Sequence, residues 1–272
     1  MNKKVWITIF AIVIVVFAVI GGVFCWNKTH KTSADVVPTE KASEPKKELP
    51  VIPTITDYKV PILMYHYIRI ADEGDELGKN LSVTPTNFAS QIKWLKDNNY
   101  QTLTLAEFAE KDKKVLSKII FDKKNPIVLT FDDGYEDAYT EALPVLKENN
   151  FTGTFFIIRN SVGKPEYMNQ NQINEMEKAG MEIGSHSLSH PNLASLDIAS
   201  AENQIAKSKL SATTFCYPAG KFDDTTVSLI EKAGYIAAVT TNPGIATQDS
   251  NLFELPRLRI FNSDSLKTKL EK

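Results

Sequence analysis

The sequence has little cysteine, little histidine and no excess of one charge. Its 272 residues include 2 Cys and 4 His, and 31 basic side chains stand against 33 acidic ones, for a formal net charge of -2. Two cysteines cannot form the disulfide framework of a small secreted scaffold. Because nucleic-acid-binding proteins usually carry a clear basic excess, the balanced charge argues against a nucleic-acid partner. With 43% apolar and 24% charged residues, the chain has the composition of a folded protein rather than a disordered one.

An uncharged apolar stretch lies near the start of the chain, from Val5 to Trp26. Its 22 residues suffice for a helix that crosses a hydrocarbon core of about 30 Å. The stretch is longer than a typical signal-peptide core, and no A-x-A-like cleavage site follows it. We therefore predict a single-pass anchor over residues 5–26, with residues 1–4 in the cytoplasm and the rest of the chain outside the cell. Cleavage of this segment stays open as an alternative.

A linker rich in Pro, Lys and Glu follows the apolar stretch, over residues 27–57. Few of its residues could contribute to a hydrophobic core, so we predict a solvated extracellular tether. Residues 58–272 remain for one globular domain. No internal repeat and no second linker divides them.

The globular part alternates between apolar, β-rich runs and amphipathic runs with helical spacing. Such alternation predicts an α/β fold, either a parallel sheet or a (β/α) barrel, with functional residues at the carboxyl ends of the strands. The expected strands are Val60–Tyr65, Pro126–Phe131, Gly153–Ile158, Met181–Ser185, Thr214–Tyr217, Ile236–Thr241 and Glu254–Ile260. The expected helices start at Thr84-Pro85 and cover Glu136–Asn149, Gln170–Ala179, Ser195–Ser211 and Thr225–Ala233.

Polar side chains follow several of these expected strands directly. Asp132 and Asp133 end one strand, His186 and His190 follow another, and His66 ends the first. Two histidines four residues apart would lie on one side of a helical turn, and with a carboxylate they form a common zinc-binding set that leaves a position for water. The second aspartate could then act as a base. The spacing leaves the two aspartates interchangeable, and a turn with a helix cap would also explain an Asp-Asp-Gly sequence.

Three segments resemble signature motifs of the polysaccharide deacetylase family, the NodB-like carbohydrate esterases of family 4. They are TFDDG at 130–134, HSLSH at 186–190 and FCYPAG at 215–220. The segment PILMYH at 61–66 is similar to the subgroup that acts on poly-N-acetylglucosamine. The resemblance implies a distorted (β/α) barrel of the NodB type and a divalent metal, with zinc the expected ion. It also implies that Asp133, His186 and His190 bind the metal, that Asp132 is the catalytic base, and that the Tyr217 N–H helps to hold the oxyanion.

The sequence departs from this family pattern at two positions. Many members have an arginine shortly before the third motif and a late histidine that acts as the acid, and neither is present here. Arg257 and Arg259 are two residues apart on the last expected strand, so both point to one face and either could support Asp132. We name Arg257 for this role and His66 for the acid. Tyr135, Tyr217 and Phe222 could stack on sugar rings or pack within the protein.

These residues predict a metal-dependent hydrolase that removes N-acetyl groups from N-acetylglucosamine residues and releases acetate. The expected substrate is a cell-wall or extracellular polysaccharide, either peptidoglycan or poly-N-acetylglucosamine. The expected location is the cell membrane, with the catalytic domain extracellular. Two alternatives stay open: an O-acetyl esterase that acts on a xylan-type glycan, and a catalytically inactive glycan-binding wall protein.

Overall fold

The computed structural model describes residues 57–209 and 211–270. They belong to one compact unit, residues 51–272. The predictions for the cytoplasmic residues 1–4, the anchor 5–26 and nearly all of the tether lie outside the described residues. Among those that are described, no helix has the length and apolar character needed to cross a membrane.

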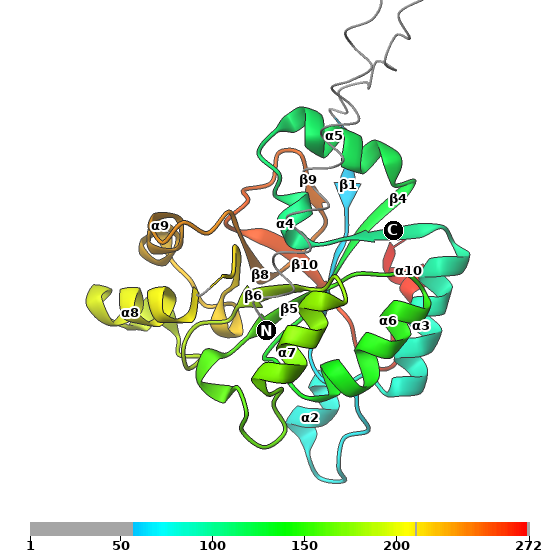
Figure 1. The fold of residues 1–272 in the computed structure, drawn as a ribbon, viewed down its shortest axis with the longest axis horizontal. Helices are drawn as coiled ribbons and strands as arrows, with labels where there is room; N and C mark the ends of the chain where they lie inside the picture. The colour runs from blue at the N-terminus through cyan, green and yellow to red at the C-terminus, as the bar shows by residue number, and fades with distance from the viewer. Residues whose placement is uncertain (1–56, 210, 271–272) are drawn as a thin grey trace, which may run out of the picture. The chain divides into compact units, whose positions relative to one another are not determined.

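Seven parallel strands form a closed barrel (Figure 1). The strand order is β2-β10-β8-β7-β6-β5-β4, and β2 also pairs with β4, which closes the ring. Each of the seven strands expected from the sequence is present, and closure of the ring selects the barrel over an open sheet. The strands are β2 (Ile62–Tyr65), β4 (Asn125–Phe131), β5 (Thr154–Ile157), β6 (Glu182–Ser185), β7 (Thr214–Cys216), β8 (Ala237–Pro243) and β10 (Leu255–Arg259).

Three short strands were not expected. β3 (Tyr100–Leu103) pairs in parallel with the first half of β4, outside the closed ring. β1 (Lys59–Val60) and β9 (Ala246–Thr247) form a separate antiparallel pair. β1 and β9 have two residues each, too few for a pattern, and Tyr-Gln-Thr-Leu of β3 forms no continuous apolar run.

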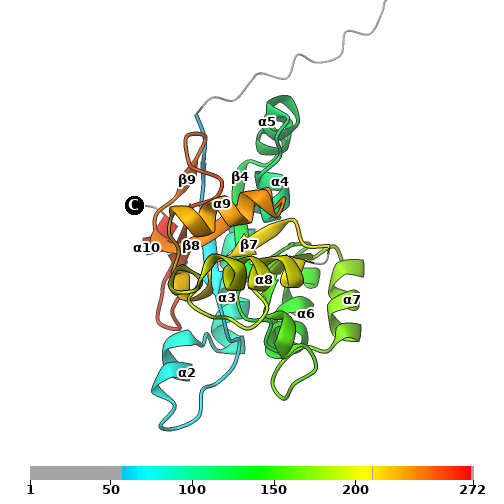
Figure 2. The same cartoon turned by 90° about the vertical axis from the view of Figure 1, so that its left-hand side faces the viewer.

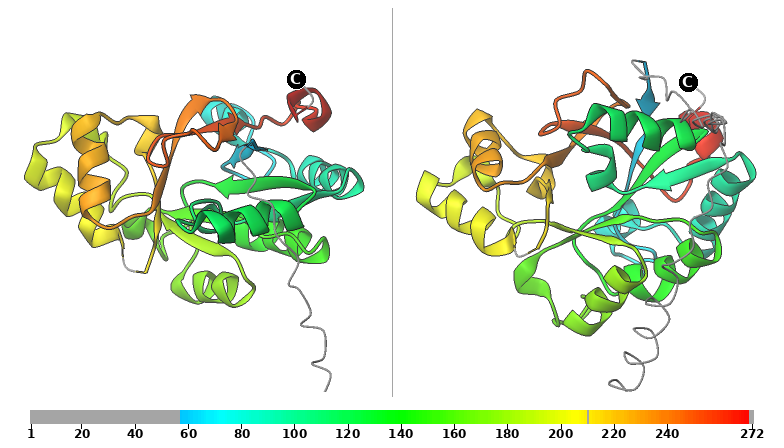
Figure 3. Two further views of the ribbon diagram at one scale, coloured as in Figure 1. Left: turned by 90° about the horizontal axis from the view of Figure 1, so that it is seen from above. Right: turned by 45° about the horizontal axis from the view of Figure 1, so that its top comes forward.

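The helices surround the barrel, with α8 and α9 on one side and α3 and α6 on another (Figures 1 and 3). The predicted helix at Thr84-Pro85 is confirmed: the Thr84 side chain accepts a hydrogen bond from the Asn87 N–H, and α3 starts at Pro85. Four helices were not expected, α2, α4, α5 and α10. The α-helices of residues 57–209 and 211–270 are α2 (Glu76–Leu81), α3 (Pro85–Asp97), α4 (Leu105–Phe108), α5 (Lys113–Asp122), α6 (Leu143–Glu148), α7 (Gln170–Lys178), α8 (Ile198–Lys209), α9 (Asp224–Lys232) and α10 (Leu266–Leu270).

The helix expected over residues 136–149 is divided. A π-helical turn (Ala138–Ala142) precedes α6, and the Leu143 N–H donates to the Ala138 carbonyl five residues earlier. Pro144 has no N–H with which to continue an α-helical ladder, so a change of hydrogen-bonding pattern next to it is expected.

Alternation along each strand sends successive side chains to the inside and the outside of the barrel. On β4, Val128 belongs to the inner apolar cluster, whereas Leu129 and Phe131 pack in the cluster beneath the outer helices. The inner cluster also includes Phe108 of α4 and Ile120 of α5. These two helices therefore close the end of the barrel from which β4 starts, and the carboxyl ends of the strands remain accessible.

Candidate active site

The carboxyl ends of the strands surround a cavity of about 740 Å³. It is lined by the residues that the sequence analysis assigned to the metal site, the base and the acid: His66 after β2, Asp132 and Asp133 after β4, and His186 and His190 after β6. Five titratable side chains from three separate strands thus lie in one place. Their convergence follows from the parallel barrel, in which every strand ends at the same rim.

The backbone after β4 directs both aspartates into this cavity. Asp132 continues the inward series of Thr130, whereas a regular strand would turn the next side chain outward. Asp133 has a φ of 74° and Gly134 a φ of 81°, so the chain leaves the strand geometry at this point. A Cβ on Gly134 would lie 2.9 Å from the Ile157 side chain, which explains why glycine is needed there. The turn places two adjacent carboxylates at one site.

Asp133, His186 and His190 form a compact set of potential metal ligands. The Asp133 Oδ1 lies 3.3 Å from His186 Nε2 and 3.7 Å from His190 Nε2. His186 is 2% exposed, and its Nδ1 lies 2.7 Å from the Cys216 carbonyl oxygen. With the Nδ1 proton donated to that carbonyl, the lone pair of Nε2 faces Asp133, as in many zinc sites. One carboxylate oxygen and two imidazole nitrogens are a donor set that suits zinc.

The loop that carries the two histidines differs from the expected helical turn. Ser187 has a φ of 64° and His190 a φ of 60°, so the segment bends through the left-handed region instead of forming a helix. The Ser187 hydroxyl accepts a hydrogen bond from the His190 N–H at 2.9 Å, which stabilises the bend. The rings still meet, with centroids 4.7 Å apart. Pro191 disfavours the right-handed helical conformation at His190, in agreement with this geometry.

Arg257 holds the Asp132 carboxylate through two parallel hydrogen bonds. Its two terminal nitrogens lie 2.7 Å from the two carboxylate oxygens, and the same guanidinium donates to the Thr240 carbonyl and to the Thr130 hydroxyl. Asp132 is 3% exposed and Arg257 only 1%. A bidentate pair of this kind fixes both the position and the plane of the carboxylate.

Burial alone would raise the pKa of Asp132, but the Arg257 charge and its hydrogen bonds outweigh this effect. The pKa of Asp132 therefore lies well below its ordinary value. The carboxylate stays ionised throughout the physiological pH range. Asp132 can therefore accept a proton from water in this pH range.

The depth of each arginine in the barrel distinguishes Arg257 from Arg259. Both face inward on β10, as their spacing predicts, but Arg259 lies one pleat nearer the rim and lines the cavity. Its guanidinium donates to the Asn80 carbonyl at 3.1 Å. The structure thus places Arg257, and not Arg259, against Asp132.

His66 lies on the other side of Asp132. Its Nε2 is 3.7 Å from the Asp132 Oδ2, and its side chain is 16% exposed. Burial lowers the pKa of His66 and outweighs the opposite effect of the two aspartates, so the resting imidazole is mostly neutral near pH 7. To act as an acid, His66 must receive its proton during the reaction.

The surroundings of Tyr217 differ from the expectation in two respects. Its N–H donates to the Val239 carbonyl at 3.2 Å, so this N–H is already used between β7 and β8. Its ring is 1% exposed and stacks on Phe222 at 4.8 Å, so it packs within the protein and does not form a sugar-binding platform. Tyr135 and Tyr167, whose rings lie 5.0 Å apart, line the cavity together with Tyr217.

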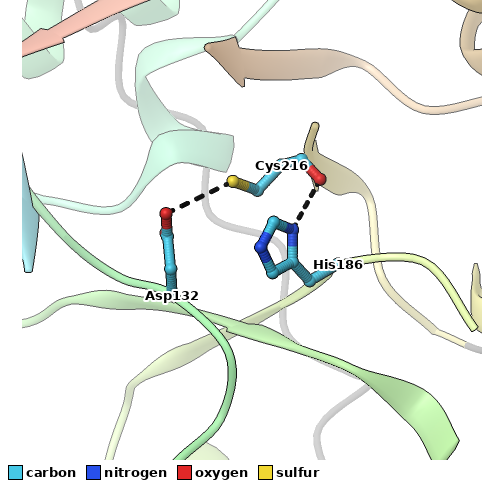
Figure 4. Close-up of side chains that lie close together, drawn as sticks. All are labelled: Asp132, His186 and Cys216. Carbon is cyan, nitrogen blue, oxygen red and sulfur yellow. Dashed lines mark hydrogen bonds between the residues drawn. The ribbon is translucent and has the colours of Figure 1, made fainter. Parts of the chain in front are cut away.

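Cys216 is a site residue that the sequence analysis did not assign (Figure 4). Its thiol lies 3.5 Å from the Asp132 Oδ2 and accepts a hydrogen bond from Arg257 at 3.3 Å. Its carbonyl accepts the hydrogen bond of His186 described above. The residue thus touches both the expected base and a potential metal ligand. Alternation on β7 could have indicated it, since Cys216 follows Thr214 on the inward face.

Cys216→Ala is expected to lower kcat for hydrolysis by about two- to tenfold with little change in KM, because Arg257 and Asp132 each lose one contact that orients them. Burial raises the pKa of the thiol, so it remains a neutral S–H donor. Cys216→Ser keeps a donor and an acceptor and should retain more activity than the alanine variant. Steady-state kinetics of the two variants test this. Equal activity in wild type and both variants would show that the thiol does not orient the base.

Comparisons with known proteins give consistent matches. A family profile described as "Polysaccharide deacetylase" matches residues 121–238. YxkH of Bacillus subtilis is 36% identical over 213 residues, which cover 74% of this chain and 71% of YxkH. A Staphylococcus epidermidis protein named poly-beta-1,6-N-acetyl-D-glucosamine N-deacetylase is 30% identical over 240 residues, or 77% of this chain and 81% of that protein.

One solved structure is also similar to this chain in both sequence and fold. The Streptococcus pyogenes deacetylase PplD in complex with acetate has a TM-score of 0.73 at 30% identity, with 79% of this chain and 98% of PplD covered. The profile match includes both aspartates and both histidines of the cavity, whereas His66 and Arg257 lie outside it.

Proposed function

Because the chain belongs to the polysaccharide deacetylase family, we propose that it is a metal-dependent hydrolase that removes N-acetyl groups from N-acetylglucosamine residues of a polysaccharide. The observation that carries the proposal is the position of an arginine-held carboxylate beside a His/His/Asp set at one cavity. The reaction adds water across the amide bond. It releases acetate and leaves an amine on the sugar.

Asp133, His186 and His190 would hold the metal, for which zinc suits the two nitrogen ligands. A divalent ion bound there would lower the pKa of a water molecule and polarise the acetyl carbonyl. Asp132 accepts the proton of the attacking water. Its orientation is fixed by Arg257, so little reorganisation is needed at the moment of transfer.

His66 supplies the proton to the departing nitrogen in this proposal. Because the imidazole is mostly neutral before the reaction, the proton taken up by Asp132 is its nearest source, across the 3.7 Å between the two side chains. The Tyr217 N–H could assist the oxyanion only if its hydrogen bond to Val239 were shared or released. The protonation sequence therefore depends on the pair Asp132 and His66.

The substrate class follows from the relatives and the form of the site. A relative named as a poly-beta-1,6-N-acetyl-D-glucosamine N-deacetylase covers most of this chain. The cavity is lined by exposed polar side chains such as Asn160 and Ser189, which could hydrogen-bond sugar hydroxyls. We propose poly-N-acetylglucosamine or peptidoglycan as the polymer, reached by a catalytic domain that is extracellular and tethered to the cell membrane.

Removal of the metal is expected to lower acetate release by at least 100-fold, and added zinc should restore it, because the bound ion would activate the attacking water. The test compares β-1,6- and β-1,4-linked N-acetylglucosamine oligomers with acetylated xylan. Bound zinc per chain is measured in parallel for the wild type and His186→Ala, which should lose the metal. Full activity after chelation would refute the metal-dependent mechanism. Release from xylan alone would favour the O-acetyl esterase.

A further inference from the structure

The segment that contains α5 carries a dense group of lysines beside exposed apolar side chains. Residues 111–124, the α5 surface, contain six lysines and two aspartates, for a net charge of +4. Val115 is 45% exposed and Phe121 is 56% exposed. The lysines are Lys111, Lys113, Lys114, Lys118, Lys123 and Lys124.

The helix presents these residues outward. Ser117 and Ile120 are its buried side chains, and Ile120 belongs to the inner apolar cluster of the barrel. Val115, Lys118 and Phe121 are spaced by three residues, so they lie on the opposite face and are all exposed. An exposed face that combines large apolar side chains with lysines is typical of helices that lie in a membrane interface.

The α5 surface lies at the end of the barrel opposite the active site. It directly precedes the first residue of β4, whereas the catalytic side chains follow the last residue of that strand. In Figure 2, α5 and α2 lie at opposite ends of the domain. Asp57, the first described residue, lines one cavity together with Phe121 and Lys124. The first described residue of the domain therefore lies on the side of α5.

A second exposed apolar segment, at the other end of the domain, is acidic, although Arg69 and Lys79 beside it pair with two of its acids. The segment Ile70–Leu77 also has exposed apolar side chains, with Ile70 at 77%, but it contains four acidic residues and no basic one. An anionic surface would repel this end and attract the α5 surface. Charge thus distinguishes the two apolar regions.

We propose that the α5 surface binds the face of an anionic phospholipid bilayer. The lysines lie at the level of the lipid phosphates, and Val115 and Phe121 enter the interface. This contact points the active-site cavity away from the bilayer, toward polymer outside it.

The test uses the full chain in nanodiscs of phosphatidylcholine alone or with about one third phosphatidylglycerol, with amide hydrogen exchange as the measurement. Exchange in residues 111–124 should slow at least about fivefold in the anionic discs, and high salt should reverse the effect. Lys113→Gln/Lys114→Gln/Lys118→Gln should abolish the slowing. Ile70→Ser, at a more exposed apolar site in the acidic segment, is the control and should keep it.

Equal exchange of α5 in the two lipids, or equal slowing in the lysine variant, would overturn the proposal. Slowing that depends on protein concentration without lipid would assign the surface to a second copy of the chain, which also overturns it. The lysine variant should hydrolyse soluble N-acetylglucosamine oligomers at the wild-type rate. Failure of the proposed function would instead appear as inactivity of the wild type, independently of lipid.

Discussion

Asp132→Asn is expected to reduce kcat for acetate release by roughly 100- to 10,000-fold, because an amide cannot accept the proton of the attacking water. Asparagine has nearly the same shape and can still receive one of the two Arg257 hydrogen bonds. The variant loses the base and also leaves the buried Arg257 guanidinium without its opposite charge, so it should be less stable, and kcat is measured where the folded protein predominates. The measurement is acetate release from N-acetylglucosamine oligomers under saturating zinc.

Asp133→Asn is the matched control for this variant, since the two carboxylates are adjacent in sequence but have different contacts. Asp133 lies against His186 and His190, so its variant should lower zinc content, whereas Asp132→Asn should bind zinc normally. Activity of Asp132→Asn within tenfold of the wild type would place the base elsewhere. If Asp132→Asn and not Asp133→Asn lost the metal, the two assignments would have to be exchanged.

Arg257→Gln is expected to destabilise the domain by about 3–5 kcal/mol and to lower activity strongly, because it leaves the buried Asp132 carboxylate without its opposite charge. Arg257→Lys keeps the charge but cannot form two parallel hydrogen bonds, so its activity should lie between that of wild type and the glutamine variant. Arg259→Gln is the control on the same strand. Its partly exposed side chain donates to one carbonyl, and its loss should change the free energy of unfolding by only about 0.5 kcal/mol. The measurements are denaturant unfolding and kcat.

The pH dependence of unfolding gives a second measure of the same pair. The pKa of Asp132 in the folded protein lies below its value in the unfolded chain. Its contribution to stability is therefore fully present above the unfolded pKa of about 3.9 and is lost as the pH falls through the folded pKa. In Arg257→Gln, burial without the guanidinium should raise the pKa of Asp132 above its value in the unfolded chain. This carboxyl should then destabilise the folded protein as the pH rises above about 3.9, the reverse of its effect in the wild type. Identical pH profiles for wild type and variant would contradict the assigned pairing.

Apolar, β-rich runs between amphipathic helices predicted the seven parallel strands but left an open sheet and a barrel as alternatives, and only the family resemblance implied the barrel. The same patterns indicated the rim residues, since the polar side chains follow the strands directly. β3 and the four-residue α4 were missed because neither shows a clear period, and tertiary packing supports them. α5 has ten residues, so its length does not explain why it was not predicted. Leu105 and Phe108 are buried in the inner cluster, a contact that local sequence does not indicate.

Residue identity and strand period determined which side chains could meet at the rim: His66, two aspartates, two histidines and two inward-facing arginines. The tertiary structure decided how they are used. Arg257 pairs with Asp132 because it lies one pleat deeper than Arg259, and Cys216 completes the contact from β7. It also showed that the histidine loop bends through the left-handed region and that the Tyr217 N–H already has a partner. These features depend on the registers of strands far apart in the chain, which no local pattern encodes.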